Sequence, residues 1–224
     1  MNIPIDIHTH RLPQTSGKAI VNCEPATFLP QKEGWYSVGI HPWSITVPSA
    51  CRNNSPTPNL IVSERMNRLE TQVCHPLVLA VGEAGLDKLA DAPMTLQLEV
   101  FERQARLAME ADKPLVIHLV RATDELLALK HTLRPTNPWI IHGFRGKAAL
   151  AEEYLRHGFF LSFGEKYREE ALRLMPAHRL FIETDDSDVS IDELYARAAA
   201  VRGVPSSELK NSVEENVIKL FFKQ

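Results

Sequence analysis

The chain has 224 residues, of which 44% are hydrophobic and 24% are charged, and its formal net charge is −3. These values are typical of a globular protein and exclude a polycation, so nucleic-acid binding would need a local basic patch. Three cysteines without a CxxC pair argue against a disulfide framework, and the sequence shows neither a leader-peptide pattern nor an apolar run of about 20 residues. We therefore expect a cytoplasmic protein that does not contact a membrane.

Short apolar runs recur along the chain and predict eight strands. They occupy residues 3–7, 18–23, 35–40, 77–82, 114–119, 138–143, 159–164 and 179–184. Apolar residues with the spacing of a helical face predict helices at 60–74, 94–112, 122–134, 148–158, 193–203 and 206–222. The proline-rich stretch 48–59 is typical of a surface loop.

Alternation of strands with helices indicates βαβ units and a parallel sheet. Eight strands in a chain of this length favour an α/β fold of the (β/α)8 TIM-barrel type, formed by one domain that covers residues 1–224. No convincing helical pattern lies between His10 and Trp35, so we expect shortened or missing helices after the first strands. An open, doubly wound sheet is the alternative architecture.

Polar residues gather where the predicted strands end. His8 and His10 are two residues apart at the end of the first strand, so their side chains point the same way. Other strand ends carry further ionisable residues: His41, Glu83, His118, His142, Glu183 and Asp185. Because the carboxyl ends of barrel strands form one rim, these side chains converge there, and imidazoles with carboxylates predict a metal site.

The ligand types narrow the metal and the chemistry. Four imidazoles and two carboxylates, without a thiolate, suit Zn, Mn, Fe, Ni or Mg. These six ligands exceed the needs of one tetrahedral zinc. A bridging carboxylate would share them between two divalent ions about 3.5–4 Å apart, which favours hydrolysis by metal-activated water. The residues alone leave the class of the hydrolysed bond open.

Six motifs occur in one order along the chain: DIHTH, GIHPW, GEAGLD, VIHLVR, IIHGFRG and ETD. With them the chain resembles the TatD-type metal-dependent hydrolases of the amidohydrolase superfamily. The resemblance implies a (β/α)8 barrel with two divalent metal ions. It assigns His8, His10, Glu83 and Asp185 to one ion and Glu83, His118 and His142 to the other, with Glu83 bridging and Asp185 as the base. Glu83 and Asp185 are thus the expected catalytic residues.

The resemblance also implies a deoxyribonuclease that hydrolyses phosphodiester bonds from the 3′ end, with DNA or a small phosphodiester as substrate. We expect His41, Arg121 and Arg145 to bind the substrate, and Glu183 to support a ligand rather than to be one. Trp43 is either a stacking platform for a base or a buried rim aromatic. No protein partner is predicted.

Some residues depart from the family pattern. The acidic run Asp186-Ser187-Asp188 follows the ETD motif, Arg145 replaces a small hydroxyl residue, and Lys88 is the nearest cation after GLD. These changes leave two alternatives open. The same metal site could hydrolyse an acyl ester or an amide, as in relatives that deacylate mischarged tRNA, or the chain could be a degenerate, non-catalytic binding protein.

Overall fold

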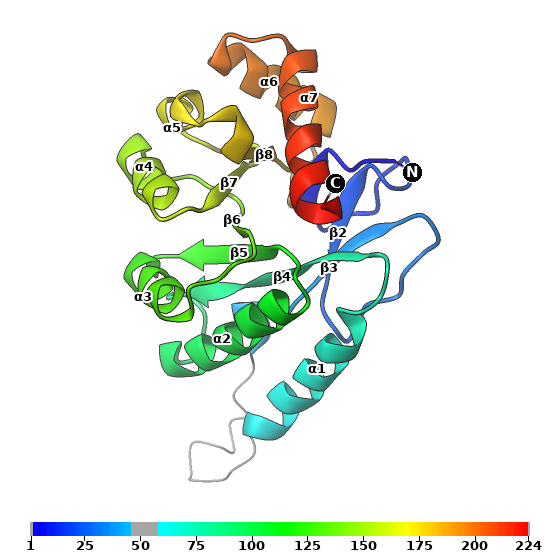
Figure 1. Cartoon of the computed structure of the whole chain (residues 1–224), viewed down its shortest axis with the longest axis vertical. Helices are drawn as coiled ribbons and strands as arrows, with labels where there is room; N and C mark the ends of the chain where they lie inside the picture. Colours follow the sequence, from blue (N-terminus) through cyan, green and yellow to red (C-terminus); the bar gives the residue numbers. More distant parts are fainter. Residues whose placement is uncertain (1, 46–57, 224) are drawn as a thin grey trace.

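The computed structural model describes residues 2–45 and 58–223, without the side chains of residues 58–61. Eight parallel strands form one sheet in which each strand pairs with the next along the chain. The strands are β1 (Asp6–Thr9), β2 (Ala19–Cys23), β3 (Trp35–Val38), β4 (Val78–Asp87), β5 (Leu115–Val120), β6 (Trp139–Ile141), β7 (Phe160–Phe163) and β8 (Leu180–Ile182). All eight predicted strands are therefore present (Figure 1). Of the predicted loop 48–59, residues 48–57 lie outside the described residues.

Strand β8 closes the sheet onto β1. The backbone N–H of Asp185 donates to the carbonyl of His8 at 2.9 Å, and the N–H of His10 donates to the carbonyl of Asp185 at 3.3 Å. Thr9 and Asp185 form an isolated parallel bridge between the two strand ends. The fold is thus a (β/α)8 barrel, and the alternative of an open, doubly wound sheet is wrong.

Strand β4 is longer than the sequence predicts, because it continues past residue 82 to Asp87. The register of β4 against β5 shifts between Val81 and Ala84, and pairing resumes through Asp87. Gly85 permits this close approach, since a Cβ atom there would lie 1.9 Å from the carbonyl oxygen of His118. The extension brings both Glu83 and Asp87 to the carboxyl end of the barrel.

The helices match the predicted pattern with two differences. They are α1 (Pro58–Gln72), α2 (Met94–Glu110), α3 (Thr123–Leu133), α4 (Ala148–Arg156), α5 (Glu169–Leu174), α6 (Ile191–Arg202) and α7 (Ser206–Val217). No helix lies between β1 and β2 or between β2 and β3, segments that the structure describes in full, as expected from the sequence. The short helix α5 was not predicted, and the predicted helix 206–222 ends in a π-helical turn, Ile218–Phe222.

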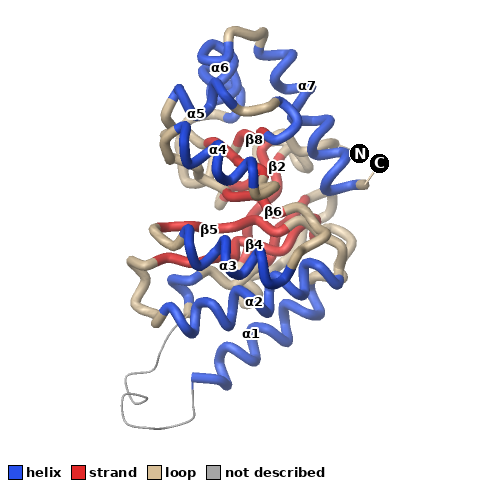
Figure 2. The backbone as a smooth tube through the Cα atoms, turned by 60° about the vertical axis from the view of Figure 1, so that its left-hand side comes forward, coloured by secondary structure: helices blue, strands red, loops and turns tan. Residues whose placement is uncertain are grey.

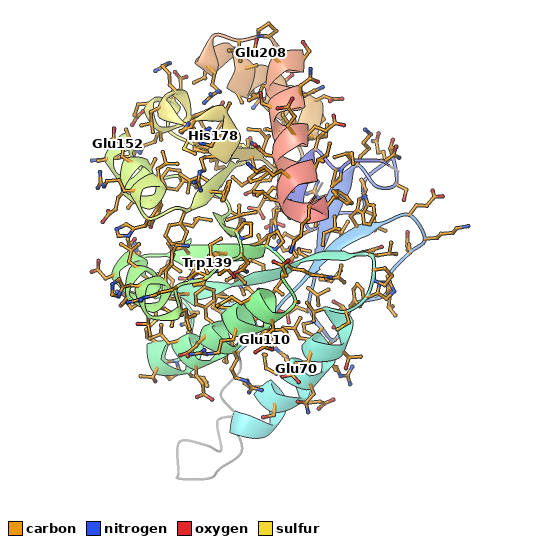
Figure 3. The ribbon with its side chains drawn as sticks, in the orientation of Figure 1. Glu70, Glu110, Trp139, Glu152, His178 and Glu208 are labelled. Atoms are coloured by element: carbon orange, nitrogen blue, oxygen red, sulfur yellow. The ribbon has the colours of Figure 1, made fainter. Side chains whose placement is uncertain are left out.

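The helices cover the barrel from outside. Figure 2 shows the strands at the centre, with α1, α2 and α3 on one side and α4 to α7 on the other. Trp139, at the start of β6, is fully buried and packs edge-on against Phe101 of α2. Figure 3 labels Trp139 in the middle of the view and Glu152 and Glu208 at its edge, and the side chains of Glu70, Glu110, Glu152 and Glu208 are exposed. Among the described residues, no helix combines the length and apolar character required to cross a membrane.

Candidate metal centre

Glu83 is the point at which the predicted site residues meet. It lies on the buried strand β4, and only 4% of the residue is exposed. Its Oε2 atom lies 3.4 Å from Nε2 of His8 and 3.5 Å from Nε2 of His10. Its Oε1 atom lies 2.8 Å from both Nδ1 of His118 and Nε2 of His142. The two oxygens of one carboxylate therefore face two separate pairs of imidazoles.

Asp185 lies beside the first pair of imidazoles. Its Oδ1 atom is 3.6 Å from Nε2 of His10 and 3.9 Å from Nε2 of His8. The residue has φ +53°, a left-handed conformation that costs a non-glycine residue about 1–3 kcal/mol. The backbone hydrogen bonds to His8 and His10 hold it there. Strand closure thus places the Asp185 carboxylate at the rim of the barrel, next to Glu83.

The donor atoms of this cluster fit a divalent cation. Two atoms that each lie about 2.1 Å from one ion are about 3.0–3.4 Å apart in octahedral or tetrahedral geometry, close to the spacings around Glu83. His8 is fully buried, and neither of its ring nitrogens has a hydrogen-bond partner among the described residues. An unpaired buried polar atom costs about 1–3 kcal/mol, a cost that a metal ligand avoids. The site residues therefore have both the spacing and an unused donor for a metal ion.

His41 approaches the same carboxylate but differs from the other imidazoles. Its Nε2 atom lies 3.2 Å from Oε1 of Glu83, while its Nδ1 atom accepts the backbone N–H of Trp43 at 3.1 Å. A backbone N–H can only donate, so in the neutral ring the proton resides on Nε2. His41 therefore presents an N–H group to the centre of the cluster, where it can donate a hydrogen bond but cannot at the same time bind a metal.

Two carboxylates stand behind the imidazoles of the second pair. Oδ2 of Asp87 lies 3.0 Å from Nε2 of His118, and Oε1 of Glu183 lies 3.3 Å from Nδ1 of His142. Such partners fix the orientation of an imidazole ligand and the nitrogen that carries its proton. The contact of Glu183 with His142 is compatible with the supporting role expected from the sequence, and that role stays a prediction. Asp87 was not identified from the sequence as a supporting residue, although Asp87 lies in the GEAGLD motif.

Two more polar residues, also missed in the sequence, orient the carboxylates. Asn22 of β2 accepts the backbone N–H of Glu83 at 2.7 Å and donates to Oε2 of Glu83 at 3.4 Å. Asp6 of β1 accepts the backbone N–H of Thr184 at 3.0 Å and its hydroxyl at 2.7 Å. Because Thr184 precedes Asp185, this pair ties the end of β8 to β1. Polar residues within otherwise apolar strand patterns were the available signal.

The charges within the cluster depend on one another. Burial by itself would raise the pKa of Glu83, but His142 and the other imidazoles outweigh it and hold this pKa well below its ordinary value. Burial lowers the pKa of His142, whereas the charges of Glu83 and Glu183 raise it well above its ordinary value. Burial also raises the pKa of Asp185. An anionic Glu83 beside His142, whose pKa is raised, is a site where a cation would displace protons on binding.

The predicted substrate-binding arginines lie beside the cluster. A cavity of about 340 Å³ is lined by Arg121, Arg145, His118, His142 and Asp185, among others. Both arginines are exposed, and Arg121 has φ +57°. The hollow thus joins two cations to two of the imidazoles and to the Asp185 carboxylate.

Two of the departures from the family pattern, the acidic run Asp186-Ser187-Asp188 and Lys88, have partners of their own. Arg11 forms an ion pair with Asp188 and donates to the carbonyl of Asp186 at 3.0 Å. Lys88 pairs with Glu125 at 2.7 Å. Arg11, which follows β1, therefore neutralises part of the acidic run, and Lys88 is paired with Glu125.

Comparisons with known proteins give a consistent result. The model of the family described as TatD related DNase matches residues 25–222. The uncharacterized metal-dependent hydrolase YabD of Bacillus subtilis is 38% identical over 120 residues, which cover 50% of this chain and 47% of that protein. The 3′-5′ ssDNA/RNA exonuclease TatD of Enterobacter lignolyticus is 26% identical over 242 residues, which cover 92% of this chain and 85% of that protein.

A solved structure agrees in fold. The crystal structure of YjjV, a TatD homologue from Escherichia coli, superposes with a TM-score of 0.76 at 19% identity and covers 99% of this chain and 98% of that one. At this identity the likeness establishes the barrel. The match to the Bacillus protein, by contrast, spans about half the length of that relative, 47%.

Proposed function

Because the chain belongs to the TatD-related DNase family, we propose that it is a two-metal-dependent phosphodiesterase that acts on the 3′ ends of DNA strands. The observation that carries the proposal is Glu83, whose two oxygens face separate pairs of imidazoles. A bridging carboxylate with this arrangement is suited to two ions rather than one. The name of the Enterobacter relative, a 3′-5′ ssDNA/RNA exonuclease, supports the choice of bond and substrate.

Each ion would have its own set of side chains. His8, His10 and Asp185 would hold one ion and His118 and His142 the other, with Glu83 shared between them. Two divalent ions supply Lewis acidity at the phosphoryl oxygen and lower the pKa of an attacking water. Asp87 and Glu183 keep the second pair of imidazoles in place.

Asp185 is the proton acceptor in this proposal. Its side chain is 21% exposed and lines the hollow that also contains Arg121 and Arg145. Burial raises its pKa above the ordinary value, which makes the carboxylate a better base than a free aspartate. A water molecule in the hollow can therefore reach Asp185 and the phosphodiester together.

The substrate phosphate would lie between the arginines and His41. Guanidinium groups bind phosphate oxygens in a bidentate manner, and Arg121 and Arg145 line the same hollow. The Nε2 atom of His41 lies 3.2 Å from Oε1 of Glu83, at the centre of the cluster. It can donate to a phosphate oxygen or to the leaving oxygen, which matches its expected role in substrate binding.

The test compares the same substitution, aspartate to asparagine, at Asp185 and at Asp188 in the acidic run that follows it. The metal-supplemented protein is assayed with Mg²⁺, Mn²⁺ and Zn²⁺ on single-stranded DNA and on bis-p-nitrophenyl phosphate. We expect Asp185→Asn to lower kcat by about 10²–10⁴-fold with metal still bound, because it removes the base. The control Asp188→Asn, which loses only the exposed ion pair to Arg11, should remain within about threefold of the wild type.

Other outcomes would redirect the proposal. Hydrolysis of an aminoacyl ester or an amide but of no phosphodiester would keep the metal centre and change the bond class. Bound metal without turnover of any of these substrates would indicate a non-catalytic binding protein.

A further inference from the structure

Trp43 is a large apolar side chain left exposed at the rim of the metal centre. It lies two residues after His41, in the 3-10 turn Pro42–Ser44 that follows β3, and 60% of it is exposed. The sequence left open whether it is a stacking platform or a buried rim aromatic. Its exposure excludes the buried reading.

The exposed ring is held in one orientation. The indole N–H donates to Oδ2 of Asp87 at 2.7 Å, and the backbone N–H of Trp43 donates to Nδ1 of His41 at 3.1 Å. The same Oδ2 atom of Asp87 lies 3.0 Å from Nε2 of His118. Trp43 is therefore linked through Asp87 to His118 and directly to the ring of His41. Its polar atom is satisfied, and the apolar faces of the indole are what it offers to solvent.

A second exposed apolar side chain is held by the same carboxylate. Oδ1 of Asp87 accepts the backbone N–H of Leu89 at 2.7 Å, and Leu89 is 53% exposed. Asp87 thus fixes an indole with one oxygen and a leucine with the other. The two arginines line a hollow that shares His118 and His142 with the cluster. The rim consequently combines cations for a phosphate with a flat apolar surface nearby.

We propose that Trp43 is the platform on which a nucleobase of the substrate stacks while its phosphodiester occupies the metal centre. This inference rests on the proposed phosphodiesterase function. An indole face accepts any base, so the platform binds a base without selecting a sequence.

The experiment compares a natural strand with one that lacks the bases of its 3′-terminal nucleotides. Metal-loaded protein cleaves two oligodeoxynucleotides of one sequence, one with natural 3′-terminal nucleotides and one with abasic tetrahydrofuran residues there. Base stacking on an aromatic side chain corresponds to about 5- to 150-fold in binding. We expect the wild type to show a lower KM for the natural strand by a factor in this range. In Trp43→Leu the two KM values should become equal, with kcat changed much less.

Trp43→Phe separates stacking from an effect on the metal. This variant keeps an aromatic face but loses the N–H donated to Asp87, as Trp43→Leu does. Under the proposal, Trp43→Phe retains most of the preference for the natural strand. If Trp43 acted only through Asp87 and His118, both variants would lose metal and would cleave both strands equally poorly. Leu29→Ala, at an apolar residue that is 83% exposed, is the control and should change neither KM.

Failure of the stacking proposal and failure of the proposed phosphodiesterase function give different results. A wild type that cleaves both strands with the same KM, unchanged by Trp43→Leu, overturns the platform and leaves the phosphodiesterase standing. A wild type that binds metal but cleaves neither strand overturns both proposals.

Discussion

The polar residues at the two ends of the barrel have different kinds of partner. At the carboxyl ends of the strands, imidazoles and carboxylates are packed against one another, and His8 is buried with neither ring nitrogen hydrogen-bonded to any described residue. At the amino ends, polar side chains satisfy backbone carbonyls. Lys113 donates to the carbonyls of Val73 and Val78, and Asn216 donates to the carbonyl of Leu180 at 3.0 Å.

This difference shows how the barrel divides stability from chemistry. Hydrogen bonds from side chains to carbonyls at the amino ends connect neighbouring strands and loops and need nothing further. The cluster at the carboxyl ends holds buried ionisable side chains close together. This costs free energy of folding, which bound cations would offset. Substitutions at the carboxyl ends should therefore change metal binding and activity, whereas those at the amino ends should change stability alone.

The largest effect is expected for Glu83→Gln. The amide can no longer present two anionic oxygens to the two pairs of imidazoles, so we expect bound metal to fall and kcat/KM to drop by at least about a thousandfold. Metal analysis by mass spectrometry and steady-state kinetics measure both. Glu193→Gln, which removes only an exposed ion pair on α6, is the matched control. Full activity in Glu83→Gln would remove the basis for a shared carboxylate.

Asp87→Asn and Glu183→Gln should have smaller effects at the same end. Each replaces the carboxylate behind one imidazole by a neutral amide, at His118 and His142 respectively. Outer partners of this kind affect metal affinity or activity by about 10–100-fold. Titration of the metal-free proteins with a divalent ion measures the change. Unaltered affinity in both variants would mean that these imidazoles are not ligands.

Lys113→Met tests the amino end. The variant leaves the carbonyls of Val73 and Val78 without their charged donor, which should lower the free energy of unfolding by about 2–3 kcal/mol. Urea unfolding followed by circular dichroism measures the loss. Metal content and kcat should stay within about twofold of the wild type. A selective loss of metal in this variant would contradict the separation of the two ends.

Lys130→Met should have the smallest effect, and one that depends on pH. The Lys130 ammonium lies 4.8 Å from the ring centroid of Trp139, and burial, aided by the charge of Arg179, lowers its pKa from 10.5 to about 8. The folded chain therefore loses this proton more readily than the unfolded chain, so stability is reduced below pH 8 and recovers between about pH 8 and 10.5.

Replacing the ammonium should therefore stabilise the protein at neutral pH. The shift alone sets an upper bound of about 3 kcal/mol, which solvent screening and the lost cation–π contacts reduce to about 1 kcal/mol. Urea unfolding of both proteins at pH 7 and pH 9.5 should show a gain at the lower pH that shrinks at the higher. A gain in the free energy of unfolding that does not depend on pH would come from packing instead.

The sequence predicted the barrel and its rim because both have local signals. Apolar runs mark the strands, and the HxH pair and the polar residue after each run mark the rim. The sequence could not predict which side chains the rim residues contact. Asn22 and Glu83 are 61 residues apart and meet only because β2, β3 and β4 adopt one particular register.

The sequence also failed to predict helix α5 and the extension of β4, for other physical reasons. Helix α5 has six residues, of which only Ala171 and Leu172 are buried, so its sequence shows no helical periodicity. The extension of β4 depends on glycines that allow close approach to β5 rather than on an apolar run. That extension positions Asp87, which is why its contact with His118 was missed.

The most direct test of the central claim is the metal content of protein purified without added metal, measured alongside DNA cleavage after supplementation with Mg²⁺, Mn²⁺ or Zn²⁺. The wild type and a His8→Ala/His10→Ala double variant are compared. We predict about two ions per wild-type chain, with at least one ion and the cleavage activity lost in the variant. A wild type that binds no metal even after supplementation would contradict the account, since the imidazoles around Glu83 would then be a buried polar network without catalytic chemistry.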